Sequence, residues 1–176
     1  TQLWAMIETP LAILNLADIA AVSHSRGPRL TCFVMGTNDL VKETRADLSA
    51  SRRPALYWLS KTITAARAYG LDVLDGVYNN FKDADGFRRE CVHGRALGFD
   101  GKTLIHPDQI AAANEVFAPP AAEVAFAKKI ITAFDQPENR GKGVITVDDR
   151  MVELMHAEMA RRTVAIAGAI EEAAAS

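Results

Sequence analysis

Cysteine is scarce in this sequence: among its 176 residues, only Cys32 and Cys91 carry a thiol. Two cysteines cannot form the disulfide framework on which small secreted domains depend. They also lack the close spacing to other ligands that is typical of a metal site. The sequence therefore favours a reducing compartment and predicts a cytoplasmic location.

A strong imbalance of charge is also missing. Twenty lysines and arginines oppose 22 aspartates and glutamates, which gives a net charge of −2 at pH 7. The sequence has no basic run, so nothing in it indicates a nucleic-acid partner. No apolar stretch is long enough to cross a membrane, so no membrane partner is expected. A hydrophobic content of 49% is instead enough for a substantial core.

What the sequence does contain is a repeated order of apolar strand, polar loop and helix. Strands are expected at about 3–7, 30–35, 73–77 and 103–105, with helices at about 9–22, 54–69, 84–96 and 107–117 and a connection ending at Gly27-Pro28. Apolar strands without clean alternation are typical of parallel strands, which need crossover helices. The fold class is therefore α/β. Four units make either a small open sheet or half of an eightfold barrel. The apolar residues at the very start favour the half-barrel, with residues missing upstream.

The remaining residues have a different pattern, which predicts a second domain. Pro119-Pro120 opens a helix to about residue 134, and a polar linker covers 135–142. A short extended piece is expected at 143–147, and Asp148 or Asp149 is expected to cap a final helix that runs to about residue 170. We expect domains at 1–118 and 119–176, with the second acting as a mobile lid or packing on a neighbouring subunit.

Two carboxylates follow consecutive predicted strands. Glu8 comes directly after the first strand, and Asp39 comes shortly after the second. Neighbouring parallel strands lie about 5 Å apart, so these side chains are expected to meet at one rim of the sheet. Oxygen ligands without a cysteine or histidine cluster favour Mg²⁺ first and Mn²⁺ second. The alternative is that each carboxylate caps a helix.

Other polar residues near the strand ends have two interpretations each. His106 is either an acid–base group or the N-cap of the helix that Pro107 opens. Lys102 could attract an anionic substrate, and residues 78–80 either contact a ligand or form a turn. Position alone makes Glu153, in the first turn expected for the final helix, an ordinary partner of the helix dipole.

Three motifs together resemble the citrate lyase β-subunit family of CoA-ester lyases, which is related to the HpcH/HpaI aldolases and the malyl-CoA lyases. They are Ile7-Glu8-Thr9-Pro10, Gly36-Thr37-Asn38-Asp39-Leu40, and Gly98-Phe99-Asp100 followed by Ile105-His106-Pro107-Asp108-Gln109-Ile110. Residues 141–143 and 147–153 fit the same family. The resemblance therefore covers nearly the whole chain.

The resemblance implies a (β/α)8 barrel of TIM type, of which this chain covers about the last four βα units plus a C-terminal helical lid. Glu8 and Asp39 match the two carboxylates that bind Mg²⁺. Gly36-Thr37-Asn38 matches the loop that binds the carboxylate of a 2-keto acid. Glu153 is the catalytic candidate, at a position where many relatives carry Asp. The family also implies a homo-trimer or hexamer in which the tail of one subunit covers the site of the next.

The implied activity is the Mg²⁺-dependent cleavage of a 3-hydroxyacyl-CoA, such as malyl-CoA or β-methylmalyl-CoA, to an acyl-CoA and a 2-keto acid such as glyoxylate. CoA enters as part of the substrate, and Glu153 would act as the general base. Three alternatives stay open: a citrate lyase β-subunit that converts a citryl thioester to oxaloacetate, a malyl-CoA thioesterase, and a catalytically incomplete fragment.

Overall fold

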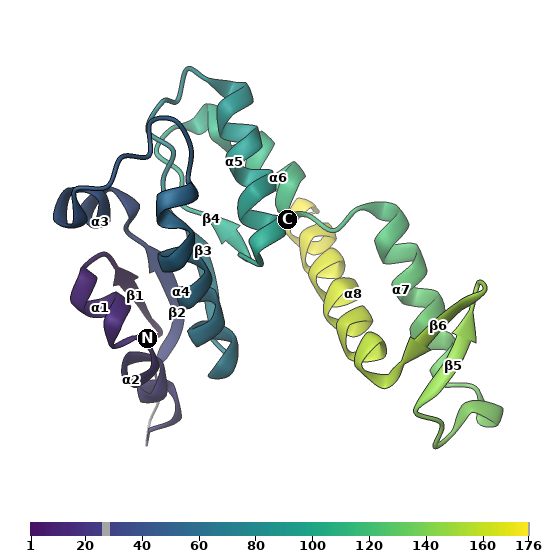
Figure 1. Ribbon diagram of the computed structural model, residues 1–176. Coiled ribbons are helices and arrows are strands. Elements are labelled where there is room, and N and C mark those ends of the chain that lie inside the picture. Colours follow the sequence, from purple (N-terminus) through teal and green to yellow (C-terminus); the bar gives the residue numbers. More distant parts are fainter. Residues whose placement is uncertain (26–28, 176) are drawn as a thin grey trace. The chain divides into compact units, whose positions relative to one another are not determined.

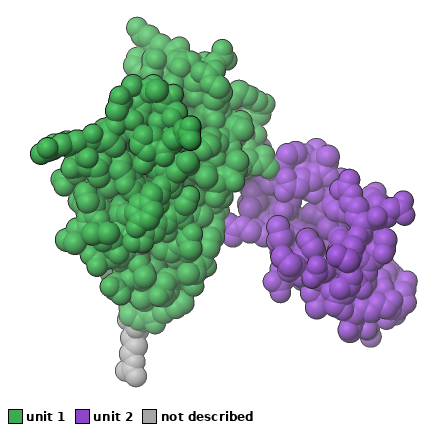
Figure 2. Space-filling model, in the orientation of Figure 1, with its two compact units in different colours: residues 1–117 green, residues 118–176 purple. Residues whose placement is uncertain are grey.

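The computed structural model describes residues 1–25 and 29–175, which form two compact units (Figure 2). The first unit is Thr1–Phe117 and the second is Ala118–Ser176. Each unit has a hydrophobic core of its own. The connection expected at Gly27-Pro28 lies outside the described residues.

A four-stranded parallel sheet forms the centre of the first unit (Figure 1). Ile7 pairs with Met35 in the first ladder, and Leu74 pairs with Gly101 in the last. Strands that stand in sequence order and are joined through helices are what repeated βα units produce, so the predicted α/β class and parallel sheet are confirmed. In order, the strands are β1 (Leu3–Ile7), β2 (Leu30–Met35), β3 (Asp72–Asp75) and β4 (Gly101–Lys102).

Among the described residues, helices pack against one face of this sheet (Figure 1). Ile7, Phe33 and Val73 belong to the core on that side. It is covered by α1 (Pro10–Leu14), α2 (Leu16–Ala21) and α4 (Leu56–Ala68). Side chains alternate along a strand, so Trp4 and Met6 point the other way, and they are 62% and 50% exposed. An uncovered apolar face suits the interior of an incomplete barrel, and the barrel itself stays a prediction.

The starts of three helices agree with their sequence signals. Thr9 caps α1, because its Oγ1 accepts a hydrogen bond from the amide of Ala12 at 3.1 Å. Asp83 caps α5 (Ala84–Leu97) in the same way, through the amide of Gly86 at 2.8 Å. A short 3₁₀ helix at Pro107–Gln109 leads into α6 (Ile110–Phe117). Pro107 therefore stands where a helix begins, as predicted.

One helix of this unit was not expected from the sequence. α3 (Thr37–Thr44) follows β2 almost at once, at a place where the polar composition predicts a loop. Its N-cap, Gly36, offers no capping side chain, so the usual start signal is absent. A charged, short helix without a cap residue gives little signal in sequence, and packing of its buried Leu40 stabilises it instead.

The fourth strand lies earlier than predicted. β4 consists of Gly101–Lys102, whereas residues 103–105 were expected to form it. The amide of Thr103 still donates to the carbonyl of Asp75 at 3.0 Å. The amide of Ile105 donates instead to Oε1 of Gln109 at 3.0 Å, which takes it out of the ladder.

The second unit combines two helices with a hairpin. Its elements are α7 (Ala121–Phe134), β5 (Val144–Val147), β6 (Arg150–Glu153) and α8 (Leu154–Ala174), and β5 pairs antiparallel to β6. The final helix thus begins at Leu154, and the prediction that Asp148 or Asp149 caps it is wrong. These two aspartates form the hairpin turn, with positive φ values of 49° and 60°. Two-residue hairpin turns favour such values because they match the twist of the strands.

Both cysteines are free and buried. Burial raises the pKa of the Cys32 thiol and of the Cys91 thiol to about 11. Since the thiolate is the reactive form, neither residue is suited to act as a nucleophile at neutral pH. Within the described part of the chain, no helix is both long and apolar enough to span a membrane.

Candidate active site

Glu8 and Asp39 lie at the ends of two adjacent strands. Glu8 follows β1 directly, and the amide of Gly36, just after β2, donates to the carbonyl of Ile7 at 2.9 Å. Asp39 stands in the first turn of α3. Glu8 packs over Gly36, where an added Cβ would lie 2.3 Å from Glu8 Cβ and 3.0 Å from Glu8 Oε2. Only glycine at position 36 leaves room for this carboxylate.

Neither carboxylate serves as a helix cap, so that alternative is wrong. The cap of α1 is the neighbouring residue Thr9, and the cap of α3 is Gly36. Among the described residues, neither Glu8 nor Asp39 has a hydrogen bond or an ion pair. The oxygens of both carboxylates are therefore available for an external ligand.

The donor set of this pair fits a magnesium ion. Within residues 1–25 and 29–175, no group of three or more His, Cys, Asp or Glu side chains could hold a metal. Mg²⁺ is usually bound by only one or two protein carboxylates and keeps positions for water and substrate oxygens. Glu8 and Asp39 are therefore the residues that would hold it in this chain.

The first turn of α3 offers hydrogen-bond donors beside the two carboxylates. Gly36 is the N-cap and its own amide donates to Ile7, whereas the amides of Thr37 and Asn38, which begin the helix, have no acceptor within it. Such amides favour an anion. Thr37 is buried beneath Gly76, where an added Cβ would lie 2.6 Å from Thr37 Oγ1. The backbone of this turn is thus tightly packed from below.

A cleft of about 560 Å³ opens beside this turn. Its walls come from Thr37 and Asn38, from the loop after β3 and from the segment after α3. The contributing residues of these two loops are 46–49, Arg52, 77–80 and Asp83, and Glu90 of α5 completes the wall.

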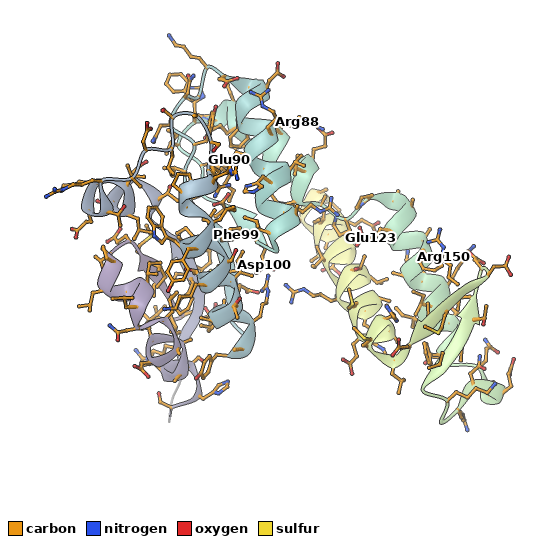
Figure 3. The ribbon with its side chains drawn as sticks, viewed as in Figure 1. Arg88, Glu90, Phe99, Asp100, Glu123 and Arg150 are labelled. Carbon is orange, nitrogen blue, oxygen red and sulfur yellow. The ribbon has the colours of Figure 1, made fainter. Side chains whose placement is uncertain are left out.

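Four charged residues, of which sequence reasoning singled out only Lys102, form a buried cluster at the wall of the cleft. Asp75, at the end of β3, is fully buried and accepts hydrogen bonds from the Arg52 guanidinium at 2.6 and 2.9 Å. The Lys102 ammonium lies 3.2 Å from Asp75 Oδ2 and 2.6 Å from Oε1 of Glu90, which reaches in from α5 (Figure 3). Two positive and two negative groups neutralise one another. Lys102 therefore presents no charge to a substrate, and the hypothesis that it attracts one is wrong.

Of the two roles considered for His106, the structure shows the N-cap. Its Nδ1 accepts a hydrogen bond from the amide of Asp108 at 3.2 Å, which makes it the predicted N-cap. Its ring stacks on Phe81 with centroids 4.6 Å apart.

Residues 78–80 belong to an ordered turn after β3. The hydroxyl of Tyr78 donates to Asp83 at 2.8 Å. Hydrogen bonds from the amide of Gly86 and from this hydroxyl lower the pKa of Asp83, which favours its ionised form. Tyr78 therefore has the turn-forming role that the sequence allowed. Asn79 also forms hydrogen bonds with Asn38 of α3.

Glu153 lies in the second unit, at the junction of β6 and α8. It is half-buried, and its amide donates to Nδ1 of His156 at 2.9 Å. The sequence predicts Glu153 in the first turn of the final helix. In the structure it precedes that helix and is its N-cap. Its position is fixed by the hairpin, whose other end carries Arg150 over the Phe126 ring at 5.1 Å (Figure 3).

The sequence of the first unit matches a known protein family. Residues 1–107 match the family model described as HpcH/HpaI aldolase/citrate lyase. The chain belongs to this family. The resemblance stated from the three motifs is therefore confirmed.

Two curated relatives show how the family varies. A (3S)-malyl-CoA thioesterase from Cereibacter sphaeroides is 53% identical over 174 residues, covering 99% of this chain and 59% of that protein. The mitochondrial citramalyl-CoA lyase from Homo sapiens is 33% identical over 170 residues, covering 94% of this chain and 50% of that protein. The chain thus spans half to three fifths of the length of these relatives.

Solved structures show the same fold. The CitE protein from Mycobacterium tuberculosis, in complex with magnesium, acetoacetate and coenzyme A, has a TM-score of 0.70 and 27% identity, covering 93% of this chain and 61% of that chain. A citrate lyase from Burkholderia xenovorans has a TM-score of 0.79 at 19% identity, covering 97% of this chain and 54% of that chain. The second likeness concerns the fold alone.

Proposed function

We propose that this protein acts on malyl-CoA or a close 3-hydroxyacyl-CoA, with Mg²⁺ held by Glu8 and Asp39. The observation that carries the proposal is the pair of unpartnered carboxylates at adjacent strand ends, beside the first amides of α3. A 2-hydroxy acid offers a carboxylate and a hydroxyl oxygen, which suit a hard ion. When bound, Mg²⁺ supplies Lewis acidity and a template for these oxygens.

Other residues of the chain bind the substrate and transfer the proton. In the turn formed by Gly36, Thr37 and Asn38, the amides of Thr37 and Asn38 bind the substrate carboxylate, because helix N-termini favour anions and the Gly36 amide already donates to Ile7. Glu153 accepts and returns a proton as the general base. We propose that residues 1–118 are part of a (β/α)8 barrel and that the protein forms a trimer or hexamer, in which residues 119–176 act as a lid and bring Glu153 to the site of a neighbouring subunit.

Hydrolysis of the thioester is the reaction best supported by the relatives. A protein named as a malyl-CoA thioesterase shares 53% of its aligned residues with this chain. In this reaction Glu153 takes a proton from water, the oxygen of that water attacks the thioester carbonyl, and the CoA thiolate leaves. The products are malate and CoA.

Carbon–carbon cleavage of the same substrate is the second candidate. The likeness to a citramalyl-CoA lyase and the family itself favour it. Here the base removes the proton of the 3-hydroxyl group, and the bond between C2 and C3 breaks to leave glyoxylate and the enolate of acetyl-CoA, which is then protonated. The same carboxylate would serve either reaction.

A product analysis separates the two reactions. We expect malyl-CoA, incubated with the protein and Mg²⁺, to release free CoA and malate in equal amounts, measured by thiol titration and chromatography. Acetyl-CoA and glyoxylate would instead identify the lyase, and parallel assays with citramalyl-CoA and citryl-CoA define the acyl group. Absence of Mg²⁺-dependent turnover with all three thioesters would contradict the proposal.

The variant Glu153→Gln tests the base. Glutamine keeps the size of the side chain but cannot accept the proton, so turnover is expected to fall at least ~100-fold, the usual scale for a lost general base. The KM should change little. Steady-state kinetics on malyl-CoA measures both.

A matched control for this variant is available on the same helix. Glu158→Gln removes an exposed carboxylate one turn further along α8, and its turnover should equal that of the wild type. Equal rates for the wild type and Glu153→Gln would remove Glu153 from the mechanism.

A further inference from the structure

We propose that Asn79 is a positioning residue for the first turn of α3, and through it for the metal ligand Asp39. The inference rests on the proposed Mg²⁺ site. It concerns a residue from a different loop, which contacts neither Glu8 nor Asp39 through any hydrogen bond among the described residues.

The side chains of Asn38 and Asn79 form a reciprocal pair. Nδ2 of Asn38 donates to Oδ1 of Asn79 at 3.1 Å, and Nδ2 of Asn79 donates to Oδ1 of Asn38 at 2.7 Å. Each amide is donor and acceptor at once, which an aspartate at either position would not reproduce. Two hydrogen bonds between the same two side chains restrict orientation more than a single bond does.

This pair compensates for a missing cap. Gly36 must be glycine because Glu8 packs over it, and a glycine has no side chain to bind the amides of the first turn. The first turn of α3 therefore lacks its usual restraint from within the helix. Asn79 supplies a restraint from the neighbouring loop, at the residue that directly precedes Asp39.

The loop that carries Asn79 is held in place by Gln109. Gln109 is 2% exposed, and its Nε2 donates to the carbonyl of Tyr78 at 3.0 Å, next to Asn79. Its Oε1 accepts the amide of Ile105 at 3.0 Å. Gln109 thus links the loop after β3 to the loop after β4 at the residue next to Asn79, while the Asn38–Asn79 pair itself is exposed.

A double-mutant cycle tests the link through metal affinity. Asn38→Ala, Asn79→Ala and the double variant are compared with the wild type for Mn²⁺ binding, followed by electron paramagnetic resonance of the free ion. Contacts that orient metal ligands change affinity by about 10- to 100-fold, so each single variant should weaken binding about tenfold. The double variant should bind no more weakly than either single variant, because both remove the same restraint.

The next residue along the chain provides the control. Asn80 lines the same cleft, and its side chain has no hydrogen-bond partner in the described residues, so Asn80→Ala should bind Mn²⁺ like the wild type. Circular dichroism verifies that each variant is folded.

The outcomes separate this inference from the function on which it rests. An unchanged affinity in Asn79→Ala, or additive losses that make the double variant about 100-fold weaker, would overturn the link while the metal site stands. Failure of the folded wild-type protein to bind Mn²⁺ would instead overturn the proposed metal site itself.

Discussion

Asp39→Ala is expected to abolish binding of Mg²⁺ and Mn²⁺ and all metal-dependent turnover, with little change in folding. One of only two carboxylates at the site would be lost, and a single acidic ligand holds a divalent ion weakly in water. The side chain is exposed and has no partner among the described residues, so its removal breaks no internal contact. Mn²⁺ binding, malyl-CoA turnover and the melting temperature measure the three expectations.

The control for Asp39 must also carry an acidic side chain in the first turn of a helix. Asp18 has that position in α2 and is likewise exposed. Asp18→Ala should leave metal binding and turnover unchanged, which separates a metal ligand from a partner of the helix dipole. Full turnover by Asp39→Ala without added metal would reject the assignment of the site.

Asp75→Ala is expected to destabilise the protein by about 3–5 kcal/mol, the usual cost of removing one partner from a buried ion pair. The change leaves the Lys102 ammonium, which is fully buried, with only Glu90 as a carboxylate partner, and it leaves Arg52 without its bidentate acceptor. Since domains are typically stable by only about 5–15 kcal/mol, much of the folding free energy would be lost. Urea unfolding followed by circular dichroism measures the difference.

An exposed ion pair in the same unit gives the comparison. Arg88 and Glu115 join α5 to α6, and their side chains are 46% and 64% exposed (Figure 3). Water screens such a pair, so Glu115→Ala should shift the urea midpoint far less than Asp75→Ala. Equal midpoints for these two variants would show that burial adds nothing to the cluster.

The helix starts after β1 and β4 could be predicted because each has a local signal. An apolar run stops at Thr9-Pro10 in one case and at His106-Pro107 in another, and both prolines stand where helices begin. α3 lacks such a signal, because the packing of Glu8 requires glycine at its N-cap. At that position, the packing of Glu8 excludes the capping side chain that would have predicted the helix start.

The hairpin of the second unit was missed for a different reason. Met151, Leu154 and Met155 have the spacing of an apolar helix face, and Asp148-Asp149 lacks the glycine that usually marks a two-residue turn. Pairing with β5 overrides the local helical pattern up to Glu153.

The charge cluster could not be found from sequence at all. Arg52, Asp75, Glu90 and Lys102 come from four separate segments and share no spacing. Each looks like a surface residue until the sheet and α5 bring them together. Glu8 and Asp39 do have a signal in the sequence, because each comes shortly after one of two consecutive strands, and adjacent parallel strands place their ends side by side. Their joint binding of a metal stays a prediction.

The open face of the sheet gives this protein an internal optical probe. Its two tryptophans report on separate surfaces, because Trp58, a residue of α4, packs in the core and is 9% exposed, while Trp4 lies on the bare face of β1. Folding alone dehydrates the first indole, and only an added layer of protein over the strands dehydrates the second. Fluorescence of a Trp58→Phe variant would therefore follow the covering of this face by other protein independently of the folding of the sheet and its helices.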